Sequence, residues 1–462
     1  MSQSQDDADA GDLDADVLAE ARAESSTPAQ TRRVDDAVEA DQAVDSPAAG
    51  RHKRSLWRDG NFLTVWSGQA LGQFGAQITE LAVPVLAVLL LHASEFEVGL
   101  LNAAGTAAFL VVGLPAGAWI DRMRKRRVMV WADLVRAVAL ACIPLLWWAG
   151  SLEMWHLYVV GLIVSVATVF FDVSYQSVVP SLVRSDQIAE ANGKFESTSQ
   201  LAGIVGPAAG GWLIGILSAP LAILITVGTY LASFVFLSIA RDDEEVPEKH
   251  EHEPLVRSIR EGLAWVFGNP LLRRIVGTTG VSNLFSTISF TLLPIFILRE
   301  LGISAQSMGI IFALSAVGGL AGAIATPRII GLIGEARAIP VSAIAFSIVA
   351  LLLPVAAMVP AIAFPLLVVQ GFIGLFTVLL YNITQVTFRQ RITPPRLLGR
   401  MNASIRFVVW GVMPLAALAA GGLGAWLGVT ATMWIGAIGQ LLSAAFVVFG
   451  PFWRMRELPQ AA

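Results

Sequence analysis

A line of polar side chains interrupts the first long apolar segment of the chain. Gln69, Gln73, Gln77 and Glu80 are spaced by four, four and three residues, so they share one face of a helix. A charged side chain in mid-membrane costs about 2.5–3.5 kcal/mol, so Glu80 must face water, pair with a cation or be protonated. Because no neighbouring segment supplies a cation at that depth, the sequence favours a carboxyl group that binds and releases a proton. The alternative is a residue at the outer rim of the membrane.

Three further charged residues of the third and fourth apolar segments are candidates for a role. Asp172, followed by Tyr175 and Gln176, has no obvious partner, and its position is as compatible with a structural role as with proton binding. Asp133 and Arg136 are three residues apart and can pair on one helix face. We interpret this pair as a structural one, tied to the basic loop that precedes it.

Neutral polar residues interrupt two later apolar segments. They could line a path for a solute, because an apolar helix gains nothing by turning such groups toward lipid. With the glutamines of the first segment and Gln176, they make up the set of candidate cavity residues. The later members are Asn283 and Ser286, and then Tyr381, Asn382 and Gln385.

The composition explains why these polar groups stand out. Hydrophobic residues make up 55% of the 462 residues and charged residues 14%, and the mean hydropathy is +0.67, all of which indicate a polytopic membrane protein. The single cysteine, Cys142, excludes an internal disulfide and cysteine-based metal sites, and we expect no metal and no cofactor. The sequence has no Gly-x-x-x-x-Gly-Lys-Ser/Thr run for ATP, so transport would draw on a proton gradient.

Twelve apolar segments approach the ~20 residues that cross a bilayer. Of the 31 Lys and Arg residues only Arg299 falls at an outer loop, which predicts that both termini are cytoplasmic. The predicted fold is an all-α membrane protein with twelve transmembrane helices in two pseudo-symmetric six-helix bundles. The segments are placed at 62–91, 98–119, 128–149, 155–179, 197–217, 220–240, 272–298, 305–327, 337–358, 361–386, 402–427 and 429–452.

The regions outside the bundles differ in composition. Residues 1–50 carry 13 acidic and 3 basic residues and no aromatic residue, which predicts a disordered tail. After an acidic linker, apolar residues from Leu255 to Phe267 recur at helical spacing and predict an amphipathic helix on the membrane surface. The predicted division is a disordered tail (1–55), a first bundle (56–240), a cytoplasmic linker with the surface helix (241–271), a second bundle (272–455) and a short cytoplasmic tail (456–462).

The two predicted bundles share a weak internal repeat. Pro84 and Pro294, Gly99 and Gly309, and Asn192 and Asn402 are each 210 residues apart. A common offset near half the chain length predicts a duplicated six-span unit.

A basic loop follows the second apolar segment, and it resembles a known motif. Short loops rich in Lys and Arg stay in the cytoplasm. The loop is similar to the one between spans 2 and 3 of the major facilitator superfamily, with Arg124 where the family usually has Gly. The resemblance implies a latch between the two halves, whereas a loop that carries only topogenic charge is the alternative. The matching residues are Gly117, Asp121, Arg122, Lys125 and Arg126, and we group Asp133 and Arg136 with them.

A second stretch resembles the exporter branch of that superfamily. Gly206, Pro207, Gly210 and Gly211 match the signature Gly-Pro-x-x-Gly-Gly, in which small residues allow helices to approach closely. Ordinary small-residue packing would give the same pattern. Shorter matches resemble the bacterial subgroup of enterobactin and macrolide exporters, and the family resemblance implies that spans 1, 4, 7 and 10 line a central cavity. These shorter matches are Pro180–Val183, Ala191 with Asn192, Glu261–Leu263 and Leu398–Arg400.

We therefore expect a monomeric transporter in the inner membrane of a bacterial cell, with no enzymatic activity and no nucleic-acid partner. It would export a bulky amphipathic small molecule, such as a drug, a macrolide or a siderophore, in exchange for protons, with rocker-switch alternating access. The alternatives are an uptake or lysolipid transporter of the same fold, or a non-transporting membrane receptor or assembly protein.

Overall fold

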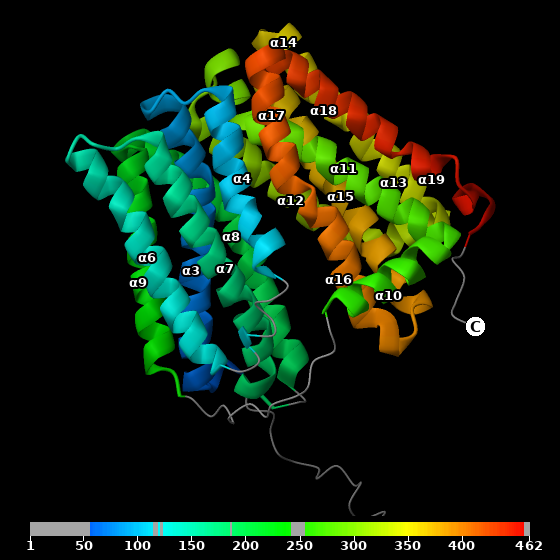
Figure 1. Ribbon diagram of the computed structural model, residues 1–462, viewed down its shortest axis with the longest axis horizontal. Helices are drawn as coiled ribbons and strands as arrows, with labels where there is room; N and C mark the ends of the chain where they lie inside the picture. The colour runs from blue at the N-terminus through cyan, green and yellow to red at the C-terminus, as the bar shows by residue number, and fades with distance from the viewer. Residues whose placement is uncertain (1–55, 114–118, 121–122, 185–186, 242–254, 457–462) are drawn as a thin grey trace, which may run out of the picture. The chain divides into compact units, whose positions relative to one another are not determined.

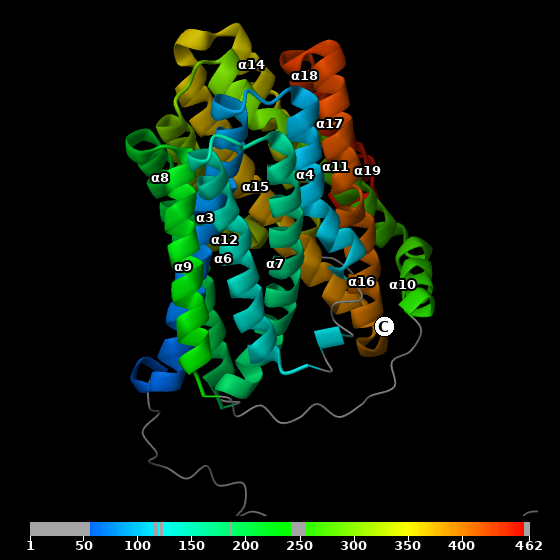
Figure 2. The same cartoon turned by 60° about the vertical axis from the view of Figure 1, so that its left-hand side comes forward.

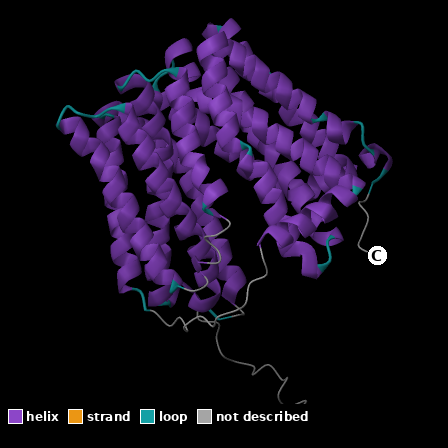
Figure 3. Ribbon diagram, viewed as in Figure 1, coloured by secondary structure: helices purple, strands orange, loops and turns teal. Residues whose placement is uncertain are grey.

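The computed structural model describes residues 56–113, 119–120, 123–184, 187–241 and 255–456. In these ranges the chain consists of helices joined by short loops, without a β-strand (Figure 3). Eleven helical stretches of the described part are long and apolar enough to cross a membrane. A further helix, α4, has 17 residues and ends just before the undescribed residues 114–118. The all-α membrane fold is therefore confirmed.

The helices fall into two groups that follow the chain order (Figure 1). In the first group α3 packs on α8 and α9, α6 packs on α7 and α9, and α4 packs on α7. These helices are α3 (Gly60–Val85), α4 (Glu95–Val111), α6 (Lys125–Trp148), α7 (Met154–Leu182), α8 (Ile188–Leu217) and α9 (Ala219–Ile239).

In the second group α15 packs on α12 and α13, and α11 packs on α17 and α18. The helices are α11 (Pro270–Ile295), α12 (Ala305–Ile333), α13 (Glu335–Ala350) with α14 (Leu352–Met358), α15 (Ala363–Ile392), α16 (Pro395–Gly411) with α17 (Met413–Leu427), and α18 (Val429–Ser443) with α19 (Ala445–Val448).

Three predicted spans are each divided into two helices; the twelfth breaks at Ala444 between α18 and α19, and proline is the physical reason in the ninth and the eleventh. The ninth span breaks at Leu351 between α13 and α14, three residues before Pro354, and the eleventh breaks at Val412 between α16 and α17, two residues before Pro414. A proline has no N–H for the carbonyl four residues earlier, so the helix cannot continue unchanged.

Three other predicted spans are too short. The helix of the fifth span begins at Ile188 instead of residue 197, that of the eighth continues to Ile333 instead of residue 327, and that of the tenth continues to Ile392 instead of residue 386. The added turn of α8 is polar and carries an ion pair between Lys194 and Glu190 at 3.2 Å, which hydropathy alone does not detect.

The two groups repeat the same local devices at an offset of 210 residues. Pro84 and Pro294 each precede a π-helical turn, η2 (Leu86–Leu90) and η4 (Phe296–Glu300). The next helices, α4 and α12, start at the equivalent caps Ser94 and Ser304, whose side chains accept a backbone N–H three residues later.

The linker region contains α10 (Leu255–Gly268), which packs on α16 (Figure 2). Val266 is buried in the same apolar cluster as residues of α11, α13 and α15, while Phe267 is exposed. The indole N–H of Trp265 donates to Thr393 Oγ1 at 3.3 Å. Part of the apolar face that the sequence assigns to the membrane surface therefore contacts protein.

Candidate transport pathway between the two helix groups

Most of the polar residues of α3 lie on the side that faces away from the contacts with α8 and α9. Gly68, Gly72 and Gly75 face side chains of α9. Ile78 and Leu81 face α8. A Cβ added to Gly210 of α8 would lie 3.3 Å from Ile78 Cα and 3.5 Å from Leu81 Cδ2. With 3.6 residues per turn, the side of α3 opposite these contacts is the one that carries Gln69, Gln73 and Glu80.

The burial of the four polar residues decreases along α3. Gln69 is buried, Gln73 and Gln77 are half-buried, and Glu80 is exposed five residues before the end of α3. The described residues offer the Glu80 carboxyl group no hydrogen bond and no ion pair. A carboxyl group in this position can gain or lose a proton without breaking a contact.

Asp133 and Arg136 form a buried ion pair on one face of α6. The second carboxylate oxygen of Asp133 accepts a hydrogen bond from Ser233 Oγ of α9 at 2.6 Å. The guanidinium of Arg136 lies 4.2 Å from the ring centre of Phe171 and 4.4 Å from that of Tyr230, so aromatic faces cover the cation.

Asp172 of α7 belongs to the same charge cluster. Asp172 has no obvious partner in the sequence, but in the structure the Arg136 guanidinium acts on it electrostatically. Among the described residues Asp133 forms the ion pair with Arg136, and the same guanidinium acts on Asp172 from a longer distance. The next residues of α7 differ, because Tyr175 packs edge-on against Phe195 at 5.1 Å while Gln176 is exposed.

The polar residues of α11 and α15 separate into two classes. Ser286 and Asn382 are exposed, and half-buried Asn283 donates to the Val409 carbonyl at 3.4 Å. Tyr381 and Gln385, by contrast, are buried. The Tyr381 hydroxyl bonds Thr279 Oγ1 at 3.0 Å and the Ile275 carbonyl at 3.2 Å, so this side chain joins α15 to α11.

The Gly-Pro-x-x-Gly-Gly stretch lies where α8 crosses both α3 and α12. A Cβ on Gly206 would collide with Gln77, and one on Gly210 would press on Ile78, both in α3. A Cβ on Gly211 would lie 2.8 Å from the Ala305 carbonyl oxygen in α12, and one on Gly309 would collide with the Pro207 carbonyl. The four signature residues therefore bring the backbones of α3, α8 and α12 together.

An equivalent crossing joins α4 to α17. A Cβ on Gly99 would lie 2.7 Å from both the Ala417 carbonyl oxygen and Gly421 Cα. Gly421 is 210 residues beyond Gly211, and Gly309 is 210 beyond Gly99, so each crossing is the counterpart of the other. Both glycine crossings, η2 and η4 lie at the same end of the molecule. We call this end the closed end.

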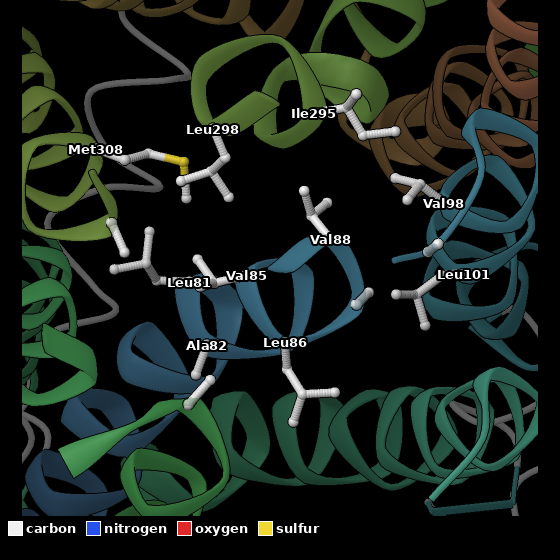
Figure 4. Close-up of a cluster of buried hydrophobic side chains, with 14 of the residues drawn as sticks. Leu81, Ala82, Val85, Leu86, Val88, Val98, Leu101, Ile295, Leu298 and Met308 are labelled. Atoms are coloured by element: carbon white, nitrogen blue, oxygen red, sulfur yellow. The ribbon is translucent and has the colours of Figure 1, made fainter. Parts of the chain in front are cut away.

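Apolar side chains and one arginine complete the closed end. Leu81, Val85 and Val88 lie close to Ile295, Leu298 and Met308 of the other group, in one buried cluster (Figure 4). Arg299 donates hydrogen bonds to the carbonyls of Ala93 and Val88, both at 2.6 Å. The sequence gives no sign of this contact beyond the isolated position of a cation in an outer loop.

Three residues of the predicted latch, Gly117, Asp121 and Arg122, lie outside the described residues. Lys125 and Arg126 begin α6. The Arg126 guanidinium donates to the carbonyls of Ala240 and, at 3.2 Å, Ser238. These carbonyls end α9, so Arg126 caps a helix of its own group, where a cation is favoured.

Sequence reasoning missed two arginines in the second group. Arg389 in α15 is only 8% exposed, and Arg406 in α16 is exposed and stacks on Trp410 at 5.5 Å from the ring centre. Arg389 lies in the last turn of the apolar helix α15, and Arg406 lies in the amphipathic helix α16.

Comparisons with known proteins agree with this arrangement. The family model of the Major Facilitator Superfamily matches residues 65–417, more than half of the chain. The "Multidrug efflux pump Tap" of Mycolicibacterium fortuitum is 27% identical over 402 residues, which are 84% of this chain and 94% of the relative. "Macrolide efflux protein A" of Streptococcus pyogenes is 26% identical over 205 residues, 44% of this chain and 50% of the relative.

Solved transporter structures share the fold. A bacterial homologue of the iron transporter ferroportin in its inward-facing state overlays with a TM-score of 0.66 at 16% identity, covering 84% of this chain and 98% of that one. The same protein in its outward-facing state gives a TM-score of 0.53 at the same identity and coverage. The family match, the helical architecture and the two glycine crossings together lead to one conclusion: this chain belongs to the Major Facilitator Superfamily and is a multi-pass membrane transporter.

Proposed function

We propose that the protein exports a bulky amphipathic small molecule, such as a drug, macrolide or siderophore-like compound, in exchange for protons. Both termini would be cytoplasmic, and a single copy of the chain would carry out the cycle. Access to a site between the helix groups would alternate as the closed end opens and the opposite end closes.

The observation that carries this proposal is the isolation of Glu80. It is the exposed acid of an otherwise apolar helix, and its carboxyl group has no partner among the described residues. Protonation neutralises it and removes the cost of holding a charge at membrane depth. Its position on α3, next to the residues that meet Gly210, links the proton to the crossing of α8 with α12.

Asp172 is a second candidate for proton coupling. Its half-buried carboxyl group shares Arg136 with Asp133, so protonation of Asp172 would change the charge balance of the cluster from net negative to neutral. Its charge has a neighbouring cation to stabilise it, whereas that of Glu80 has none. We therefore assign Glu80 the principal role.

The substrate class rests on the relatives and on the polar residues available. The relatives are named as multidrug and macrolide efflux proteins. The exposed candidates Gln176, Ser286 and Asn382 offer neutral hydrogen-bonding groups among apolar helices, which suits a large molecule with few charges.

The energetics allow one proton per cycle. A proton that moves down a potential of about 100 mV releases roughly 2.3 kcal/mol. This corresponds to about a fifty-fold concentration ratio of a neutral solute. One titrating carboxyl group is therefore sufficient.

Efflux of a lipophilic dye and of a macrolide from cells tests the proposal. We expect wild-type efflux to stop on addition of a protonophore, and Glu80→Gln to abolish it while the protein still reaches the membrane. Asp172→Asn should slow efflux less. The control is Glu153→Gln, an equal change of charge at the exposed start of α7, where a glutamine oxygen can still accept the 3.0 Å hydrogen bond from Trp155.

Efflux that continues at the wild-type rate in Glu80→Gln cells with a protonophore present would contradict the proposal. Absence of efflux for every compound, with the protein in the membrane, would instead favour an uptake or lysolipid transporter. A receptor or assembly protein would also fail to transport but would depend on residues 1–50, so a tail deletion separates it from a transporter.

A further inference from the structure

Arg389 and Arg406 are cations without an acidic partner. Neither guanidinium forms an ion pair or hydrogen bond with any residue that the structure describes, although Arg389 is 8% exposed. Other arginines of this helix group are paired. Arg391, two residues from Arg389, forms a two-pronged ion pair with Glu335 at 2.8 and 2.9 Å, and Arg274 donates to the Phe446 carbonyl at 3.0 Å.

The surroundings of Arg389 increase the cost of its charge. Its Nε atom is fully buried and has no hydrogen-bond acceptor, and one turn earlier the Oε1 atom of Gln385 is also buried without a donor. Two ionisable groups, Tyr381 and Arg406, interact electrostatically with Arg389, so one of its neighbours is a second cation. Like charges repel each other, and the repulsion adds to the cost of holding the buried Arg389 charge, although Arg406 is exposed.

An anion between the two arginines would remove this cost. The planar guanidinium group presents parallel N–H donors that match a carboxylate or a phosphate, and it binds them more strongly than neutral donors do. Arg406 can approach such an anion from an exposed position, while Arg389 supplies a fixed, buried donor.

Aromatic rings border the same place. Trp410, on which Arg406 stacks, packs edge-on against Phe109 of α4 at 5.8 Å between ring centres. Trp410 and Phe109 are both partly exposed, and they belong to different helix groups. An alkyl or aromatic part of a ligand can therefore rest beside the cations, at the boundary between the groups.

We propose that Arg389 and Arg406 form an oxyanion site that holds the phosphate or carboxylate of an amphiphile, with the apolar part of the ligand against Trp410 and Phe109. The site deepens the proposed export function and rests on it, since the amphiphile would be a transported molecule. The substrate range then includes anionic amphiphiles in addition to neutral ones.

Thermal unfolding of the purified protein in phosphatidylcholine nanodiscs tests the site, because a ligand that binds the folded state raises its melting temperature. The probes are dodecyl phosphate and dodecanoate below their micellar concentrations, with dodecyltrimethylammonium and inorganic phosphate as controls. We expect the two anionic amphiphiles to stabilise the wild type. Inorganic phosphate and the cationic amphiphile should have little effect at the same concentrations.

Matched variants assign the effect to the two arginines. Arg389→Gln and Arg406→Gln should each weaken dodecyl phosphate binding about tenfold or more, the loss expected for a charge-assisted hydrogen bond. Arg389→Lys keeps the positive charge but removes the planar guanidinium group with its parallel N–H donors, so it should give an intermediate loss of affinity. Arg328→Gln removes one cation from an exposed position of α12 and should leave binding unchanged. If the buried substitution impairs folding, the exposed Arg406→Gln variant still decides the question.

Stabilisation by dodecyl phosphate that persists in both Gln variants, or that dodecyltrimethylammonium or inorganic phosphate reproduces, would overturn the site. Nanodiscs with phosphatidylglycerol identify the source of the anion. If they abolish the response to dodecyl phosphate, a bilayer headgroup occupies the site, and if they do not, a soluble amphiphile does. The assay needs no gradient, so its failure with dye efflux intact would leave the proposed function standing.

Discussion

At the scale of single residues, the buried charges of the two helix groups are handled differently. In the first group, the Arg136 guanidinium is paired with Asp133 and lies between the rings of Phe171 and Tyr230, and Ser233 saturates the other carboxylate oxygen. In the second group, Arg389 has none of these compensations. We interpret the first arrangement as structural and the second as a place for a ligand.

The structural role of the Asp133–Arg136 pair leads to a stability prediction. Arg136→Gln leaves the buried Asp133 carboxylate without its cation, and removal of one partner of a buried ion pair costs about 3–5 kcal/mol. The double variant Asp133→Asn with Arg136→Gln should recover part of this loss, because the buried Asp133 charge is removed together with its cation, while Asp172 still loses its neighbouring cation. Chemical denaturation in mixed micelles measures both effects.

The exposed arginine Arg328 of α12 provides the control for that experiment. Arg328→Gln should change the free energy of unfolding little. If Arg136→Gln were no more destabilising than Arg328→Gln, the pair would contribute nothing to stability.

At the scale of helices, glycine decides which elements can meet at the closed end. Gly211 and Gly309 allow the α8 and α12 backbones to touch, and Gly99 and Gly421 do the same for α4 and α17. Arg299 adds two hydrogen bonds across the groups. Such close backbone approach replaces the hydrophobic driving force that helices lack within a membrane.

A larger side chain at one crossing should therefore open the closed end. Gly309→Leu collides with the Pro207 carbonyl, and overpacking of about 1–3 kcal/mol shifts a two-state equilibrium about 5- to 150-fold. The reporter is a cysteine at Val88, fully buried in this state, in a protein with Cys142→Ser. Maleimide labelling of the purified protein should become faster in the Gly309→Leu variant.

Gly331 offers a matched control in the same helix, since a Cβ there meets nothing within 4 Å. Gly331→Leu should leave the labelling rate unchanged. Equal rates in the Gly309→Leu, Gly331→Leu and unsubstituted proteins would show that the crossing does not hold the closed end together.

At the scale of the whole molecule, the two helix groups are copies of one unit, and this was partly readable from the sequence. The pairs Pro84 with Pro294 and Gly99 with Gly309 predict the 210-residue offset, and the structure adds Gly211 with Gly421 and η2 with η4. Local signals of this kind survive in the sequence because proline, glycine and helix caps act on the backbone directly.

Contacts between distant helices could not be predicted in the same way. Hydropathy gives the position of a span but not its rotation, so Tyr381 and Asn382 are equivalent in the sequence although one is buried and the other exposed. The Tyr230 ring over Arg136 and the Arg299 bonds to another helix group depend on tertiary packing. Helix ends were missed where proline or polar turns override the apolar pattern, as at Pro354 and in the first turns of α8.

The central claim is that proton movement through Glu80 drives transport, and proteoliposomes with an imposed pH gradient test it most directly. The protein should move a lipophilic dye against its concentration gradient when protons can flow the opposite way, and a protonophore should abolish this accumulation. Glu80→Gln should lose the response to the pH gradient but keep dye movement down its own gradient. Dye accumulation by the wild type that does not depend on the pH gradient would contradict the account. Dye accumulation by Glu80→Gln that still depends on the pH gradient would contradict it as well.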